Sequence, residues 1–337
     1  MMDSIGDFPV LPADISIEAA ARALQHYGLG DGLPLVPPTS QRLRSMLAAV
    51  TDSQWSAGLM PPLFGDLRVA AVAYQCVLAG CEPAHLPIVM AAAQAVLAPE
   101  FNLLGVLTTT GTPAVAVVVH GPIAAALGVR GDGNCLGPGA GANACIGRAL
   151  SLVMRNIGGA REGIGDMATM GQPAKYTLCF GESPDATIPS LAVRRGLSAT
   201  QDAVTVMAIS GTAEILPVEG GSNAAQILGP VALSMGAAIA QSGARQRPPQ
   251  GQVMLLPPEL LRALAKFGYG VCEIQEYLYQ LGYVPALPGE SVVAAKVARA
   301  AADIDIIEVG GAGVKMTYAP LWSGGTEIQT VPVAALT

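Results

Sequence analysis

Three side chains near residue 81 have the types and spacing of a thiol active site. Cys81 follows Gly80, where an apolar helical run ends, and Pro83 starts the next predicted helix. Cys81 is therefore expected at a helix N-terminus, where free N–H groups favour a thiolate. Glu82 and His85 lie within one turn and could carry protons. The sequence predicts Cys81 as a nucleophile, with a small buried apolar residue as the alternative.

A glycine-rich segment that runs into a predicted helix is the best candidate for binding an anion. Glycines let backbone N–H groups converge on an anion, and the helix N-terminus adds positive potential. The spacing is neither that of a phosphate-binding P-loop nor that of a dinucleotide-binding loop. The predicted substrate-binding residues of this region are Asn134, Gly137, Gly139, Asn143 and Arg148. The alternative is a tight turn followed by a solvated or interface face of the helix.

Two lysines beside turns could neutralise a substrate carboxylate. Lys175 precedes a predicted strand at 176–180, and Lys315 follows a glycine-rich turn after a buried strand. Ligands of open α/β sheets lie beyond the carboxyl ends of strands, a position that His120 shares. A metal-independent lyase or hydratase that uses Asp31, His120 or Lys315 for acid–base work is therefore the alternative to thiol chemistry.

Three apolar, β-branched runs predict buried strands at 114–119, 204–209 and 304–309, and each run is followed by glycine. Helical stretches flank these runs and include a hairpin at 257–267 and 271–281. The pattern predicts an α/β fold of mixed or largely parallel sheets flanked by helices, with two domains or lobes.

The segment 243–251 is rich in glycine, proline and arginine and is the best linker candidate. We expect residues 1–242 to form the main α/β body, with a helical N-terminal part. Residues 252–337 would form a C-terminal part with the helical hairpin, a final strand and a glycine-rich loop.

The composition limits the classes of partner. Of 337 residues, 51% are hydrophobic and only 13% are charged, so another copy of the chain is expected to cover part of the surface. The net charge is −7 and no run of Lys or Arg occurs, which argues against nucleic acid. The sequence predicts no membrane span and no signal peptide, so we expect a cytoplasmic homo-oligomer.

Metal binding is not expected, and no cofactor motif is present. The chain has three histidines. Cys76, Cys81 and His85 have C-x4-C-x3-H spacing, but a helix break at Gly80 would let their side chains diverge.

Several motifs resemble a poorly characterised bacterial family associated with UGSC (seleno)proteins. They are DGLPLVPPT at 31–39, AGCEP at 79–83 and GPGxGANxxIGRA at 137–149, and the resemblance spans most of the chain. UGSC proteins are similar to the selenoprotein subunits of amino-acid reductases. The resemblance therefore implies thiol or selenol chemistry on a small carboxylate, with a UGSC-type protein as partner.

The sequence thus predicts an enzyme, or an enzyme subunit, that acts on a small anionic substrate through the thiolate of Cys81. The lyase or hydratase is one alternative. A non-catalytic partner subunit of a UGSC-type redox protein is the other.

Overall fold

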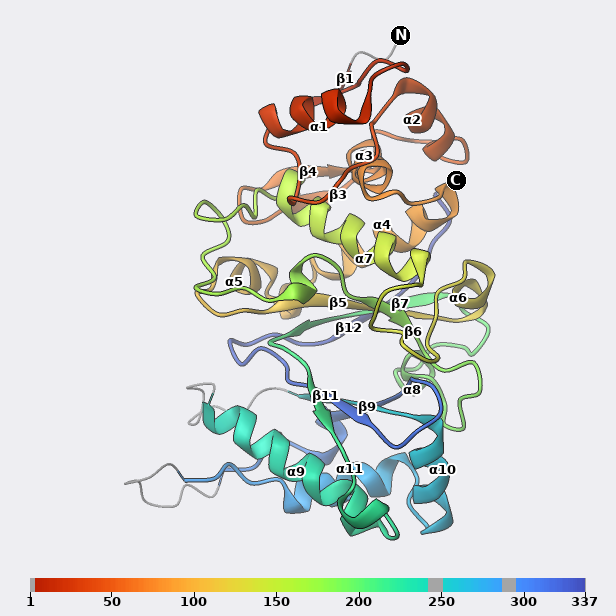
Figure 1. Cartoon of the computed structure of the whole chain (residues 1–337), viewed down its shortest axis with the longest axis vertical. Helices are drawn as coiled ribbons and strands as arrows, with labels where there is room; N and C mark the ends of the chain where they lie inside the picture. The colour runs from red at the N-terminus through yellow and green to blue at the C-terminus, as the bar shows by residue number, and fades with distance from the viewer. Residues whose placement is uncertain (1–3, 242–250, 287–294, 337) are drawn as a thin grey trace.

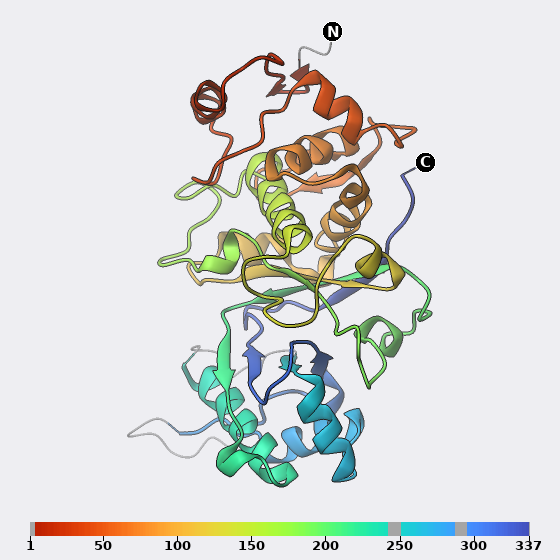
Figure 2. The same ribbon diagram turned by 45° about the vertical axis from the view of Figure 1, so that its right-hand side comes forward.

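The computed structural model describes residues 4–241, 251–286 and 295–336. Two four-stranded sheets lie face to face in the middle of the molecule, and helices cover the outer face of each (Figure 1). The N-terminal helices lie at one end of the long axis and the helices of residues 224–281 at the other (Figure 2). The result is four layers in the order helix, sheet, sheet, helix.

The first sheet is the centre of the larger lobe. Its strand order is β12 (Gln329–Pro332), β7 (Ala203–Ile209), β5 (Ala114–His120) and β6 (Cys179–Gly181). β5 is parallel to β6 but antiparallel to β7, so the sheet is mixed. Every residue of β5 and β7 is buried, as expected for strands covered on both faces. Along β5, Val117 packs toward the helices and Val118 toward the second sheet.

The second sheet has the order β10 (Ile304–Glu308), β9 (Gln252–Leu256), β11 (Met316–Ala319) and β8 (Ala213–Ile215). β9 and β10 are parallel, and β11 is antiparallel to β9. Val253 and Leu255 face the first sheet, whereas Met254 and Leu256 face the outer helices. This alternation joins the two sheets through one apolar layer.

Helices of the larger lobe pack in two tiers on the first sheet. The first tier is α4 (Leu86–Ala95) and α7 (Gly141–Leu152), and α3 (Val69–Ala79) packs on both. All residues of α3 are buried, because α2 (Ser40–Met46) covers its other side. The end of the lobe is built from α1 (Ile17–His26), the β1–β2 hairpin (Ser4–Ile5 and Phe8–Pro9) and the β3–β4 hairpin (Ser56–Met60 and Gly65–Arg68).

The outer helices of the second sheet are α9 (Ala224–Gln241), α10 (Pro258–Lys266) and α11 (Val271–Leu281). Shorter helices are α5 (Leu103–Thr108), α6 (Pro122–Ala126) and α8 (Leu191–Arg194). Single 3-10 turns are η1 (Pro83–His85), η2 (Pro99–Phe101), η4 (Pro173–Lys175), η5 (Val218–Gly220) and η6 (Ala301–Asp303). A π-helical turn, η3 (Val153–Ile157), continues α7.

The predicted α/β class with mixed sheets is confirmed, and the two sheets form two lobes. The predicted boundary near residue 242 is not the division between the sheets. β8 and α9 precede it but pack in the second lobe, and β12 returns from the C-terminal part to the first sheet. All but the last residue of the predicted linker 243–251 lies outside the described residues.

By length and composition, α9 is apolar enough to cross a membrane, and so is the bent pair Pro83–Ala95 and Pro99–Thr108 if it is one span. Half of the α9 window is buried inside the molecule, where the helix packs on β8 and β11.

Candidate functional site

The predicted turn before Cys81 is present. α3 ends at Gly80, whose φ of 82° is the left-handed conformation that glycine adopts without strain. The Cys81 N–H then donates to the Cys76 carbonyl oxygen at 2.9 Å. The following helix begins with the 3-10 turn η1 at Pro83, and α4 proper begins only at Leu86.

The Cys81 thiol is held in its protonated form. Its Sγ donates to the Cys145 carbonyl oxygen at 3.3 Å. The hydrogen-bonded side chain of Cys76 raises the pKa of Cys81 well above its ordinary range, burial raises it further, and His85 opposes both effects. The expected lowering of the Cys81 pKa is therefore wrong, and its role as nucleophile stays a prediction.

Glu82 and His85 differ sharply in environment. The Glu82 N–H donates to His85 Nδ1 at 3.1 Å, so a neutral His85 ring carries its proton on Nε2. His85 is buried and contacts the sulfur of Cys81, whereas Glu82 is exposed. The structure therefore joins Cys81 with His85 and leaves the Glu82 carboxylate in solvent.

The glycine-rich segment is organised by its own side chains. Asn143 Nδ2 donates to the Arg130 and Cys135 carbonyl oxygens at 2.9 and 3.1 Å, and its Oδ1 accepts from the Arg130 N–H. Asn134 Nδ2 donates to the Pro138 carbonyl oxygen at 2.8 Å. A Cβ at Gly137 would lie 2.2 Å from Asn134 Oδ1, so glycine is needed there for packing.

Gly139, with φ of 117°, has open space where a Cβ would be. The loop also meets the other glycine-rich turn, since the Gly310 N–H donates to the Gly131 carbonyl oxygen at 2.8 Å. Asn134, Gly137 and Asn143 thus have structural roles in the described contacts.

Arg148 is fully engaged with the segment at 31–39. Its Nε and one Nη donate to the two oxygens of Asp31, each at 2.8 Å, and the other Nη donates to the Pro34 carbonyl oxygen at 3.0 Å. Burial alone would raise the pKa of Asp31, but hydrogen bonds from Arg148 and from the Leu33 N–H lower it overall. The Arg148 guanidinium therefore holds the motif to α7 and is not free for a substrate.

A cleft of about 540 Å³ collects polar side chains that the sequence places far apart. Its walls come from α5, the start of β5, the end of α7, η3 and the loop after η3. Four of its buried apolar lining residues are here called the base: Val106, Val115, Leu152 and Met154. Its polar lining residues, here called the rim, are Asp31, Ser151, Arg155, Glu162, Asp166, Gln172, Lys175 and Tyr176.

Two ion pairs at this rim are accessible. Lys175 Nζ lies 2.6 and 2.8 Å from the oxygens of Asp166, and both side chains are 24% exposed. Arg155 donates to both oxygens of Glu162, and its Nε donates to the Gly30 carbonyl oxygen. The hydrogen bonds from Arg155 lower the pKa of Glu162 to about 2, although the Glu162 side chain is 79% exposed.

The π turn η3 positions this part of the rim. The Gly158 N–H donates to the Val153 carbonyl oxygen, five residues back. A Cβ at Gly158 would lie 2.3 Å from the Pro61 carbonyl oxygen, so the chain before β4 packs directly on the turn. Met154 and Arg155 then line the cleft.

The structure separates the sequence-predicted residues. Lys175 and Asp31 lie at the cleft, as does Arg155, whose position on the face of Arg148 and Ser151 is visible from helical spacing. The loop of residues 131–143 does not line the cleft, so the structure does not bring it into one pocket with Lys175.

Lys315 and His120 lie apart from the cleft. Lys315 is exposed and pairs with Glu214 at 3.3 Å in the second sheet. His120 is buried, with Nδ1 at 3.0 Å from Glu182 Oε2 and Nε2 at 2.7 Å from Thr205 Oγ1.

Glu162, Asp166, Gln172 and Tyr176 were not predicted as site residues. The polar loop that contains Asp166 and Lys175 is the only signal in the sequence that points to them.

No protein-family model, curated protein or solved structure matches this chain. Within the described residues, no group of three or more His, Cys, Asp or Glu side chains is arranged to hold a metal ion.

We expect Arg148→Met to lower the free energy of unfolding by about 3 kcal/mol, because the partly buried Asp31 carboxylate loses its partner. The pKa of Asp31 is lowered in the folded state, so its contribution is present above the unfolded pKa of about 4 and is lost as the pH falls through the folded value. Urea unfolding of the native protein and the variant between neutral and acidic pH measures both effects. Lys315→Met is the matched control and should change stability by less than about 1 kcal/mol, since its pair is exposed.

Native alkylation tests the protonated state of Cys81. We expect iodoacetamide at neutral pH to modify the exposed Cys272 first and Cys81 at least about tenfold more slowly, because each unit of raised pKa removes nine tenths of the thiolate. Peptide mass spectrometry reads both rates, with Cys81→Ser and Cys272→Ser as site controls. Fast modification of Cys81 below the pH at which an ordinary thiol reacts would contradict the raised pKa.

Proposed function

We propose that the cleft is the active site of an enzyme that acts on a small carboxylate by proton transfer, as a lyase or hydratase does. The observation that carries this proposal is the set of paired, accessible ionic groups above an apolar base. Cavities of this size and mixed lining suit small organic molecules.

Glu162 supports a carboxylate as the ligand group. Arg155 is fixed by the Gly30 carbonyl, whereas the Glu162 side chain is mostly exposed and reaches back to the guanidinium. Glu162 therefore occupies the position that a substrate carboxylate would take, and the exchange replaces one carboxylate on Arg155 by another. A bidentate Arg–carboxylate contact also orients the substrate.

Lys175 and Asp166 supply groups for proton transfer. Asp166 accepts the proton from the carbon next to the substrate carboxylate, and the electron pair moves onto the carboxylate oxygens. The pair then forms the carbon–carbon double bond while the hydroxyl on the next carbon leaves as water, with the proton that Asp166 returns. Lys175, which already contacts Asp166, stabilises the charge that develops there. Asp31 at the same rim stays paired with Arg148 and shapes the wall.

The contact between His85 and Cys81 supports a second proposal, thiol chemistry at Cys81 on the same class of substrate. His85 lowers the pKa of Cys81, but Cys76 and burial raise it more. The cleft holds its charged groups in accessible ion pairs beside an apolar base, and we therefore favour proton transfer there.

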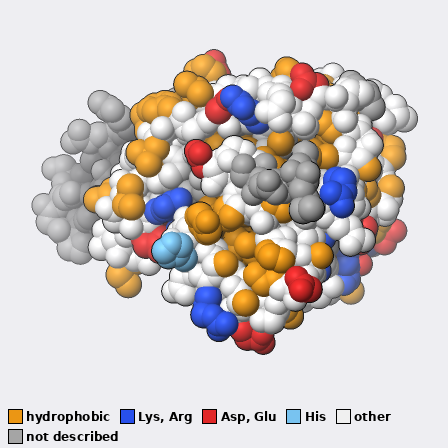
Figure 3. Space-filling model, turned by 90° about the horizontal axis from the view of Figure 1, so that it is seen from above, with side chains coloured by type: hydrophobic (Ala, Val, Ile, Leu, Met, Phe, Trp, Pro, Cys, Tyr) orange, Lys and Arg blue, Asp and Glu red, His pale blue; other side chains and the backbone are white. Residues whose placement is uncertain are grey.

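We also propose that the chain forms a homo-oligomer. On the N-terminal end of the molecule, hydrophobic side chains gather near the middle of the face, with charged side chains scattered around them (Figure 3). The β3–β4 hairpin exposes Leu59, Leu63 and Phe64, each more than half exposed.

Ligand-observed NMR with C3–C6 hydroxy and unsaturated carboxylic acids tests the cleft. We expect Arg155→Met to weaken binding of a bound acid at least about tenfold, because it removes the bidentate contact. Asp166→Asn should keep binding and abolish exchange of the proton next to the carboxylate with D2O. Glu162→Gln should keep or strengthen binding.

Lys315→Met is the control for loss of a positive charge, and it should leave both binding and exchange unchanged. If Arg155→Met and Asp166→Asn both behave as the native protein does, the cleft is not the site. Loss of turnover in Cys81→Ser with full activity in Asp166→Asn would establish the thiol proposal instead.

Light scattering at micromolar concentration tests the oligomer. We expect at least a dimer, because so low a charged fraction leaves apolar surface to be covered. A mass equal to that of one chain would reject it.

A further inference from the structure

A second cavity of about 550 Å³ lies beyond the π turn. The β1–β2 hairpin, the end of α1, β4, the start of α3 and the second half of η3 form its walls. None of its lining residues lines the cleft. It is therefore a separate space on the same part of the chain.

Asn156 and Arg161, which line this cavity, each carry a buried polar atom with no partner among the described residues. In Asn156 it is Oδ1, in a side chain that is 8% exposed and whose Nδ2 donates to Gln75 Oε1 at 2.8 Å; Gln75 Nε2, behind the wall, is unpaired as well. In Arg161 it is Nε. Leaving such a group unpaired costs about 1–3 kcal/mol, so buried polar atoms in folded proteins almost always have partners. The two residues that carry an unpaired acceptor and an unpaired charged donor, Asn156 and Arg161, thus line the same cavity.

The Arg161 guanidinium is placed there by its surroundings. Gly28, with φ of 67°, leaves room for it, since a Cβ there would lie 3.0 Å from Arg161 Nη1. Among the described residues Arg161 forms no ion pair. Asp66 and Arg68 on the same wall pair with each other at 2.6 Å, and Asp7 is exposed.

The remaining wall combines the polar side chains of Ser53 and Gln54 with apolar and aromatic ones. Phe8 stacks on Tyr74 at 4.9 Å between ring centroids, which holds its ring in place, and Ala70 and Ala71 of α3 lie beside it. Such a wall suits the carbon body of an organic ligand better than a bare inorganic ion.

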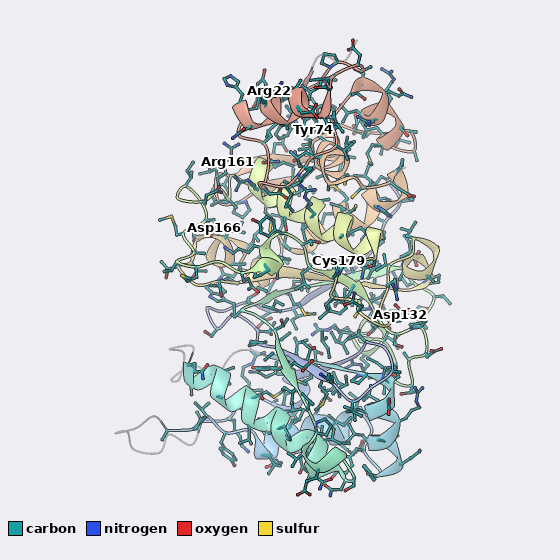
Figure 4. All side chains as sticks on the ribbon, in the orientation of Figure 1. Arg22, Tyr74, Asp132, Arg161, Asp166 and Cys179 are labelled. Carbon is teal, nitrogen blue, oxygen red and sulfur yellow. The ribbon has the colours of Figure 1, made fainter. Side chains whose placement is uncertain are left out.

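We propose that this cavity is a second ligand site, which binds a small hydroxy or amino acid anion. The anion pairs with Arg161, and the hydroxyl or amino group of the ligand donates to Asn156 Oδ1. Figure 4 shows Arg161 and Asp166 on the same side of the molecule, in the chain that follows α7, so the site adjoins the loop of the cleft.

The test measures binding of glycolate and acetate to the full chain that carries Arg155→Met, so that the cleft does not contribute. We expect glycolate to bind about fivefold more tightly than acetate, because only glycolate can donate to Asn156 Oδ1. Adding Arg161→Met should weaken glycolate at least about tenfold, whereas Arg161→Lys should keep part of the affinity. Arg68→Met is the control on the same wall and should change glycolate binding little.

The melting temperature separates ligand binding from a structural role of Arg161, because a structural role would make Arg161→Met lower it. Without ligand, Arg161→Met should melt no lower than its parent, because it removes an unpaired buried donor. A crystal soaked with glycolate should place the carboxylate on Arg161. Ordered water alone at Arg161 and Asn156, with glycolate binding unchanged by Arg161→Met, would overturn the proposal and leave the cleft proposal intact.

Discussion

The close packing of the end of α7 on β4 is the constraint on which both cavities depend. A Cβ at Gly65 would lie 2.0 Å from the Ile157 carbonyl oxygen, so β4 and the π turn touch through their backbones. The turn cannot move without displacing the hairpin. Two consecutive residues of the turn therefore line different cavities: Arg155 lines the cleft, and Asn156 lines the second cavity. A regular α-helix has one residue fewer in this turn, so it would direct the chain after Gly158 differently.

The buried helix α3 contacts the π turn through its one amide side chain. Gln75 is its only amide and is completely buried, and its oxygen accepts from Asn156 on the π turn. This bond sets the rotation of the turn relative to α3, although Gln75 Nε2 and Asn156 Oδ1 have no partner among the described residues. Arg148, eight residues earlier in α7, ties the helix to Asp31 in the same way, so polar contacts across long stretches of sequence hold both α7 and the π turn.

Local patterns predicted the parts of the fold that depend on local chemistry. The apolar runs at β5, β7 and β10 form buried strands, and α11 has the predicted bounds. Both signals, a β-branched run and an apolar helical repeat, depend on residues within a single element. Strand direction was not predictable: β7 is antiparallel to β5, so Ser210, which directly follows β7, lies at the opposite end of the sheet from His120, the last residue of β5. The direction of the Cys81 pKa shift was not predictable either, because the pKa depends on Cys76 and on burial rather than on the turn that precedes Cys81.

The loop after η3 connects the two cavities physically. The carbonyl oxygen of Arg161 accepts from the N–H groups of Ile164, Gly165 and Asp166 at 2.9–3.0 Å, so the residue whose side chain enters the second cavity also closes the turn that carries Asp166. A Cβ at Gly165 would lie 2.4 Å from the Gly159 carbonyl oxygen, which leaves this turn little room to deform. A change in the backbone position of Arg161 would therefore be transmitted through these hydrogen bonds to Asp166, the partner of Lys175. Coupling between the sites follows if two positions of this turn differ in their affinity for either ligand, and by linkage each ligand would then change the binding of the other by the same factor.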